Sequence, residues 1–259
     1  MNILETIIAR KKMEVAEKKR SRSIEDLEQG SFFKNETLSF KNFLLRDDKT
    51  GIIAEFKRKS PSKGIINASA TVAEVTSAYT KYGASGISIL TDEEFFGGSL
   101  KDLSDATINE VPLLRKDFII DEYQLIESKA FGAEIILLIA ACLTKDEVKI
   151  LSGIAKNTGL NVLLEIHNEQ ELEHICDDVD VVGVNNRDLK TFSVDINRSV
   201  ELSSKIPADK IKISESGIDD VSNINLLKQY GFKGFLIGEK FMKNENPGKA
   251  FQNFVAELK

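Results

Sequence analysis

The chain has 259 residues, 42% of them hydrophobic and 29% charged, as is typical of a globular protein that can bury a large core. Its net charge of −6 argues against a protein devoted to nucleic acid but allows a local cationic pocket for a small anion. No apolar run reaches the ~18 residues that cross a membrane, the first residues do not form a signal peptide, and two cysteines imply no disulfide framework, so we expect a cytoplasmic protein.

Residues 1–48 are predicted to form a helical extension. Apolar residues near the start alternate with lysines and glutamates, as on an amphipathic helix, and Ser39 could cap a second, shorter helix. We expect this extension to pack across one end of the domain formed by residues 49–259. The whole chain, residues 1–259, would then be a single domain.

From residue 51 onward, a short apolar run, a polar break and a helical stretch repeat along the chain. Several helical stretches end near a glycine that can adopt the left-handed conformation of a helix cap. The apolar runs are continuous rather than alternating, which indicates strands buried on both faces of a parallel sheet. The predicted strands are residues 51–56, 86–90, 111–115, 134–139, 160–166, 179–184, 210–214 and 234–238, and the cap glycines are Gly83, Gly132, Gly159 and Gly231.

Eight such units predict a closed (β/α)8 barrel, the TIM barrel, preceded by the helical extension. The alternative is an open doubly wound sheet, which would carry a glycine-rich turn after its first strand. Lys-Arg-Lys-Ser-Pro stands there instead, at residues 57–61, and this favours the barrel.

The first predicted strand ends in charged residues that share one face. Glu55 and Lys57 point the same way because side chains alternate along a strand, while Phe56 points the other way. A carboxylate and an ammonium at the end of an apolar strand raise the free energy of the folded state unless they form an ion pair with each other or bind a ligand. A structural ion pair would explain these two residues as well as a catalytic role does.

Similar polar residues follow the other strands, and barrel enzymes carry their catalytic groups at the carboxyl ends of the strands. Each residue alone is more often structural, but together they would converge on one opening. Two glycines follow strands seven and eight, where barrels commonly hold a phosphate through backbone N–H groups, although ordinary turns also use glycine. The residues at these ends include Glu55, Lys57, Asp92, Arg115, Lys116, Asp117, Glu165, His167, Asn185, Arg187, Glu215, Ser216, Gly217, Gly238 and Glu239.

No metal or cofactor is expected. His167 and His174 lack the spacing and the third ligand of a zinc site. Motifs for a dinucleotide or for ATP are also missing from the sequence.

Six segments of the sequence together carry a family resemblance. They are residues 53–62, 114–118, 163–167, 183–189, 214–218 and 235–239. These segments closely resemble the indole-3-glycerol phosphate synthase family, and the likeness extends over essentially the whole chain. The resemblance implies a decarboxylating, dehydrating ring closure in tryptophan biosynthesis, with no cofactor. The substrate would be 1-(2-carboxyphenylamino)-1-deoxyribulose 5-phosphate and the product indole-3-glycerol phosphate.

The resemblance also implies roles for individual residues. Lys116 would be the general acid that protonates the carbonyl oxygen, and Glu165 the general base of the later dehydration. Lys57, supported by Glu55, would hold the substrate carboxylate or phosphate. The family's other positions correspond here to supporting polar groups (Ser60, Asn185, Arg187, Glu215, Ser216), an apolar wall around the anthranilate ring (Phe96, Phe118, Leu137, Leu189) and a phosphate site (Lys57, Ser216, Gly217, Gly238, Glu239).

Two further expectations concern charge. Burial, or neighbouring cations such as Lys57 and Arg187, would lower the pKa of Lys116, so that its ammonium can act as an acid near neutral pH. The pair Glu239-Lys240 departs from the family, whose members usually have a small or hydroxyl residue in one or both places.

Other functions are compatible with a barrel that binds phosphate. A Schiff-base aldolase would also place a lysine at a strand end, and a phosphosugar isomerase would share the phosphate loops. We expect a phosphorylated small molecule as the partner, no nucleic acid or membrane, and a monomer, because the helical faces are polar.

Overall fold

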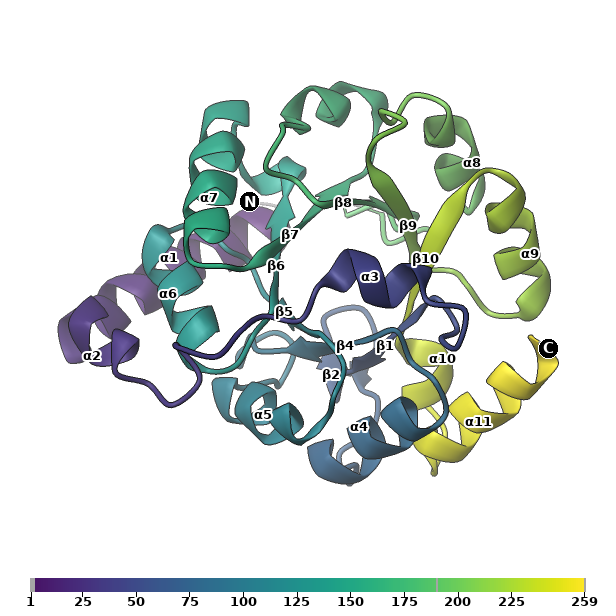
Figure 1. Cartoon of the computed structure of the whole chain (residues 1–259), viewed down its shortest axis with the longest axis horizontal. Coiled ribbons are helices and arrows are strands. Elements are labelled where there is room, and N and C mark those ends of the chain that lie inside the picture. Colours follow the sequence, from purple (N-terminus) through teal and green to yellow (C-terminus); the bar gives the residue numbers. More distant parts are fainter. Residues whose placement is uncertain (1–2, 190, 259) are drawn as a thin grey trace.

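The computed structural model describes residues 3–189 and 191–258. Eight parallel strands close into a barrel with helices on its outside (Figure 1), which confirms the predicted TIM barrel. The strands are β1 (Ile52–Phe56), β4 (Gly86–Leu90), β5 (Leu113–Lys116), β6 (Ile135–Ile139), β7 (Asn161–Ile166), β8 (Val181–Asn185), β9 (Ile211–Glu215) and β10 (Phe232–Ile237). Their order around the barrel is β1-β10-β9-β8-β7-β6-β5-β4, and β4 pairs with β1 to close it.

Helices connect the strands on the outside of the barrel. All four predicted cap glycines have positive φ angles, of 96° at Gly83, 87° at Gly132, 79° at Gly159 and 82° at Gly231, so each ends its helix in the left-handed conformation. The connecting helices are α4 (Val72–Lys81), α5 (Leu100–Asp105), η1 (Ala106–Ile108), α6 (Glu122–Ala130), η2 (Ala140–Cys142), α7 (Lys145–Asn157), η3 (Glu169–His174), α8 (Asn197–Ser203), α9 (Val221–Gln229), α10 (Glu239–Met242) and α11 (Pro247–Glu257).

The core has two layers. Outward-facing strand residues such as Phe56 and Ile89 pack against the helices in one large apolar cluster. Inward-facing residues such as Ile53 and Leu163 fill the barrel, together with Phe40 from the extension. Because each strand buries both faces, its sequence is a continuous apolar run.

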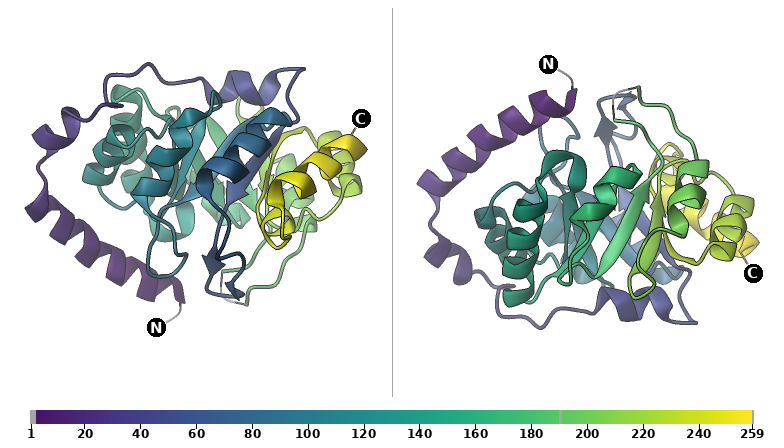
Figure 2. Two further views of the ribbon diagram at one scale, coloured as in Figure 1. Left: turned by 90° about the horizontal axis from the view of Figure 1, so that it is seen from below. Right: turned by 90° about the horizontal axis from the view of Figure 1, so that it is seen from above.

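The extension contains three helices, α1 (Ile3–Ser21), α2 (Ile24–Glu28) and α3 (Phe40–Leu45). Figure 2 shows α3 at one end of the barrel, while the first turns of α1 reach the opposite end. Phe40 and Leu44 of α3 are buried in the cluster that fills the barrel, so α3 closes its floor. The extension therefore contacts both ends of the barrel, whereas the sequence predicted that it packs across only one end.

Some local structure differs from the prediction. The segment after β1, for which the sequence predicted no strand, folds into a small hairpin of β2 (Lys59–Ser60) and β3 (Gly64–Ile65). This hairpin lies at the same end of the barrel as the start of α1 (Figure 2). No helix within the described residues is long and apolar enough to cross a membrane.

Candidate active site

Every residue to which the resemblance gives a role lines one cavity of about 460 Å³ at the carboxyl ends of the barrel strands, whereas the strand-end residues Asp92, Arg115 and His167 do not line it. The charged and amide groups come from the ends of six of the eight strands, β1, β5, β7, β8, β9 and β10, or from the segments that follow them. The cavity is lined by Glu55, Lys57, Ser60, Phe96, Lys116, Phe118, Leu137, Glu165, Asn185, Arg187, Leu189, Glu215, Ser216, Gly217, Gly238 and Glu239, among others.

Glu55 and Lys57 form an ion pair at the end of β1, as their alternation predicts. The Lys57 Nζ lies 2.5 Å from Oε1 of Glu55, and Glu55 is buried. Gly238 makes room for this carboxylate, since a Cβ added at Gly238 would lie 2.4 Å from Oε1 of Glu55. The pair is thus fixed against the loop that follows β10.

Lys116, at the end of β5, contacts two buried carboxylates. Its Nζ donates to Oε2 of Glu165 at 2.8 Å and lies 3.4 Å from Oε2 of Glu215. Glu215 packs across the neighbouring strand at Gly183, where an added Cβ would lie 2.3 Å from Oε1 of Glu215. One ammonium therefore stands between two carboxylates that have almost no access to solvent.

The charge states of these three groups differ. Burial opposes the ammonium of Lys116, but Glu165 and Glu215 outweigh it and raise the pKa of Lys116 above its usual value. The expectation that neighbouring cations lower this pKa is wrong, because the nearest charges to Lys116 are carboxylates. Burial tends to raise the pKa of Glu165, yet the ammonium of Lys116 lowers it well below its usual range. Burial raises the pKa of Glu215 to about 8, so Glu215 is a neutral acid at pH 7.

The loops after β8 and β9 are shaped by one buried side chain. Asn186 donates to the Ser216 carbonyl at 3.0 Å and to Ser214 Oγ at 3.0 Å. Ser216 has a φ of 66°, a left-handed conformation that non-glycine residues rarely adopt. Gly217 follows with a φ of 74°, and an added Cβ there would lie 2.4 Å from a Val194 methyl.

At the rim, Glu239 faces two cations. Its carboxylate oxygens lie 3.7 Å from Lys63 Nζ and 3.8 Å from the guanidinium of Arg187. Asn185 accepts a hydrogen bond from the backbone N–H of Arg187 at 3.0 Å and so orders the start of this loop. The departure from the family pattern at Glu239 thus places a partly exposed negative charge at this end of the cavity.

The opposite wall is apolar and extends beyond the predicted residues. The rings of Phe96 and Phe118 lie 6.1 Å apart between centroids. Ile3, Leu4 and Ile7 of α1 also line the cavity. The sequence showed that α1 has an apolar face, but not that the start of this face covers the opening.

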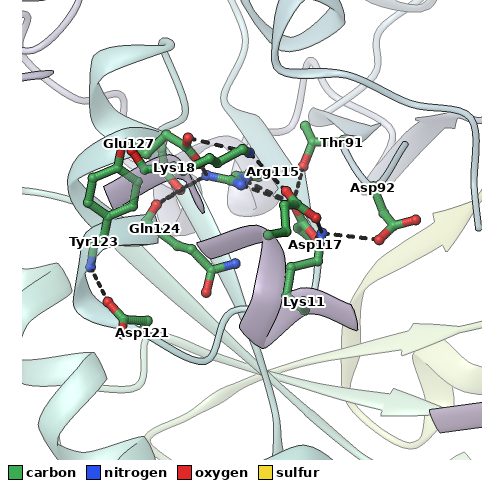
Figure 3. Close-up of polar contacts among 12 residues, drawn as sticks. Lys11, Lys18, Thr91, Asp92, Arg115, Asp117, Asp121, Tyr123, Gln124 and Glu127 are labelled. Atoms are coloured by element: carbon green, nitrogen blue, oxygen red, sulfur yellow. Dashed lines mark hydrogen bonds and ion pairs between the residues drawn. The ribbon is translucent and has the colours of Figure 1, made fainter. Parts of the chain in front are cut away.

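A buried ionic network holds α1 in this place (Figure 3). Lys11 is 1% exposed, and its Nζ lies 3.1 Å from Asp92 and 3.0 Å from Asp117, in the loops after β4 and β5. Asp92 also accepts the backbone N–H of Phe96 at 3.3 Å, and Asp117 that of Phe118 at 2.8 Å. Lys11 therefore connects α1 to the two loops that carry the aromatic wall.

Asp117 is further tied to Arg115, which points away from the cavity. The Arg115 guanidinium lies 3.0 Å from Asp117 and 2.9 Å from Glu127 of α6. Arg115 is fully buried, so this strand-end cation is structural. Among residues 3–189 and 191–258, no group of three or more His, Cys, Asp or Glu side chains is arranged to hold a metal ion.

Sequence comparison with known proteins supports the same assignment as the geometry of the site. A family model described as indole-3-glycerol phosphate synthase matches residues 4–254. The chain belongs to this family. Curated indole-3-glycerol phosphate synthases from Bacteroides thetaiotaomicron and Alkaliphilus metalliredigens are 48% and 42% identical to it, each over 99% of both chains. One from Acinetobacter baumannii is 39% identical over 96% of this chain and 94% of its own.

Solved structures with low sequence identity share the fold. The tryptophan synthase complex from Pyrococcus furiosus matches with a TM-score of 0.60 at 16% identity, over 82% of this chain and 98% of that one. The 3-hexulose-6-phosphate synthase from Salmonella typhimurium matches with a TM-score of 0.60 at 11% identity, over 80% and 97%. These likenesses support the barrel alone.

Membership in the indole-3-glycerol phosphate synthase family confirms the function predicted from the sequence. The chain is a carboxy-lyase of tryptophan biosynthesis that acts on a phosphorylated small molecule. An aldolase or a sugar isomerase, the two alternatives, has no support among these relatives.

Proposed function

We propose that the cavity closes the indole ring with Lys116 as its general acid and Glu165 as its general base. The observation that carries this assignment is the placement of the Lys116 ammonium between an ionised and a neutral carboxyl group inside one cavity. Such a set can both give and take protons at pH 7.

In the first step, the ring carbon that bears the substrate carboxylate attacks the ketone carbon of the sugar. A carbon–carbon bond forms, and the carbonyl oxygen takes a proton from Lys116. The raised pKa of Lys116 is compatible with this transfer, because the oxyanion that develops on the substrate is a far stronger base than Glu165.

In the next steps, CO₂ leaves and the ring becomes aromatic again. The new hydroxyl takes a second proton and departs as water, while the adjacent carbon loses a proton to Glu165. Two protons are delivered and one is removed, so each turnover takes up one proton from solvent. Lys57 follows β1, two strands from the β5 strand that carries Lys116, and lines the cavity as a second donor.

The two ends of the cavity suit the two ends of the substrate. We assign the anthranilate ring to the apolar wall of Phe96, Phe118, Leu137 and Leu189. The phosphate belongs at the turns of Ser216, Gly217 and Gly238, with backbone N–H groups and the cations Lys57 and Arg187 as donors. Ser60 of the hairpin, Asn185 and Glu215 support these groups from the rim and floor of the cavity.

We also propose that the chain acts as a single domain and a monomer in the cytoplasm. The N-terminal helices share buried clusters with the barrel, which favours one folding unit. Cys142 and Cys176 are free thiols, as suits a reducing compartment.

The test is incubation of the purified chain with 1-(2-carboxyphenylamino)-1-deoxyribulose 5-phosphate. Indole fluorescence should rise in step with one equivalent of CO₂. Borohydride added during turnover should leave the protein mass unchanged, whereas an aldolase would trap its lysine as a covalent adduct. Fluorescence without CO₂, or a reduced adduct, would contradict the proposed chemistry.

A further inference from the structure

His167 lies beside the proposed base, yet it does not line the cavity, and the mechanism above gives it no task. It follows Glu165 by two residues at the end of β7, so both side chains lie on the same side of the chain. The ring is 9% exposed. A buried imidazole next to a catalytic carboxylate can change the charge state of that carboxylate, so the contacts of the ring matter for the chemistry.

The imidazole is held between two carboxylates. Its Nε2 lies 3.3 Å from Oε1 of Glu165, and its Nδ1 lies 3.3 Å from Oε2 of Glu171 in η3. Glu171 is itself fixed, because it accepts the backbone N–H of His167 and the side-chain amide of Asn168, both at 2.7 Å. The ring therefore has little freedom to turn away from Glu165.

This arrangement selects the charged form of the ring. The Nδ1 contact with Glu171 is a hydrogen bond, whereas the Nε2 contact with Glu165 is an ion-pair contact without hydrogen-bond geometry. An imidazolium places positive charge next to both carboxylates, which a neutral imidazole does not. Burial alone would lower the pKa of His167, but Glu165 and Glu171 outweigh it and raise this pKa to about 9. The positive charge is thus present throughout the neutral range.

Within residues 3–189 and 191–258, the charged neighbours of the His167 ring are carboxylates. Glu165 of β7 and Glu171 of η3 are the charged groups that face the ring, and Lys116 of β5 lies beyond Glu165. The Cys142 thiol of η2 faces the same two carboxylates, and burial raises its pKa to about 12, which keeps it neutral. The imidazolium therefore acts on Glu165 and Glu171.

The two carboxyl groups beside Lys116 differ in two respects. The Lys116 Nζ lies 2.8 Å from Glu165 and 3.4 Å from Glu215. Glu165 and Glu215 both contact the Lys116 ammonium, but of these two carboxyl groups His167 contacts only Glu165. Two buried carboxyl groups that share one cation compete for a single negative charge. A second cation next to Glu165 strengthens the preference for an ionised Glu165 that the shorter Lys116 contact already gives.

We propose that His167 is a positioning residue that makes Glu165, and not Glu215, the ionised partner of Lys116. This inference rests on the proposed function, in which Glu165 must be ionised to take a proton from carbon. His167 would act through Glu165 and not on the substrate. Without the imidazolium, part of the negative charge would move to Glu215, and Glu165 would be protonated in a fraction of the molecules.

The first experiment reads the charge directly and needs no substrate. The chain has only two histidines, so ¹⁵N-histidine labelling with His174→Gln as the assignment variant isolates the His167 signal. We expect His167 to remain an imidazolium at pH 8, and its titration midpoint to fall by at least one pH unit in Glu165→Gln. A midpoint at or below 6.5, or one that Glu165→Gln leaves unmoved, would overturn the proposal.

The second experiment follows activity in His167→Gln, which keeps a hydrogen-bond donor but removes the charge. We expect kcat to fall at least tenfold with KM within twofold, and the acidic limb of the kcat–pH profile to move up by one pH unit or more. His174→Gln is the matched control, because the His174 nitrogens hydrogen-bond to the backbone carbonyls of Glu171 and Leu143. Its profile should superimpose on that of the parent chain.

An unmoved acidic limb in folded His167→Gln would overturn the proposal, since a merely structural residue would not shift it. If His167→Gln fails to fold, the titration of His167 in the parent chain and in Glu165→Gln decides alone. Should Glu165→Gln turn over normally, the base assignment under the proposed function fails. The titration still reports whether His167 charges Glu165.

Discussion

Replacement of Lys11 by methionine should detach α1 from the mouth of the barrel. The Lys11 ammonium is buried and contacts Asp92 at 3.1 Å, Asp117 at 3.0 Å and Glu14 at 2.7 Å. Removing one partner of a buried ionic group typically costs 3–5 kcal/mol, because the remaining charges are left uncompensated. Asp117 keeps Arg115 as a partner, and Asp92 keeps two backbone N–H groups, so we expect the lower end of this range, about 3 kcal/mol.

The assay is urea denaturation followed by circular dichroism, with Lys12→Met as the matched control. Lys12 is the next residue of the same helix and is exposed, so its replacement should change stability by less than about 0.5 kcal/mol. Lys11→Met should also raise KM, because Ile3, Leu4 and Ile7 line the cavity through α1. Equal stability and equal KM in the two variants would refute the view that Lys11 anchors the helix over the site.

Three further predictions concern charge around the cavity. Lys57→Ala should raise KM and lower kcat, because the cation anchors an anion as well as serving the chemistry; an unchanged KM in steady-state assays would contradict this. Glu239→Gln should lower KM about fourfold at low salt, since one unit charge repels another at 5 Å in water by about 0.8 kcal/mol; a higher KM would show that this carboxylate helps to bind. The pKa of Glu215 is raised to about 8 in the folded chain, from its usual value of 4.5. Between about pH 4.5 and pH 8 the folded chain therefore keeps a proton that the unfolded chain has released, so the free energy of unfolding should fall as the pH rises through this range. Glu215→Gln should flatten this slope in denaturation curves measured from pH 5 to 8, and an equally steep slope would indicate that other groups cause it.

Much of the fold and the site was predictable, because a parallel barrel brings residues that follow different strands in the sequence together at one end. Continuous apolar runs mark parallel strands, and polar residues at their carboxyl ends must then share one opening. Glu55 and Lys57 illustrate this well, because their two-residue spacing alone puts them on one face and the structure pairs them at 2.5 Å.

The rest depends on distances between elements, which no periodicity encodes. The pKa of Lys116 was predicted with the wrong sign, because the sequence shows which charges exist but not that two carboxylates lie nearer than the cations. The contribution of Ile3 to the cavity was missed for a related reason, since an amphipathic pattern reveals an apolar face but not its partner. The short helices α5 and α8 carry too few apolar residues for a recognisable period.

His167 is an intermediate case. Its place at a strand end was visible in the sequence. Its role emerges only from the position of Glu171, which η3 brings back onto the ring.

The most direct measurement of the central claim is the turnover of Lys116→Ala in a chain shown to be folded. A single ammonium between Glu165 and Glu215 is assigned the proton delivery that starts ring closure, and a placed acid contributes on the order of 10² to 10⁴ in rate. We predict that kcat falls by that factor while the chain unfolds cooperatively and still binds the substrate. Turnover within a few-fold of the parent chain would remove Lys116 from the acid role and contradict the account.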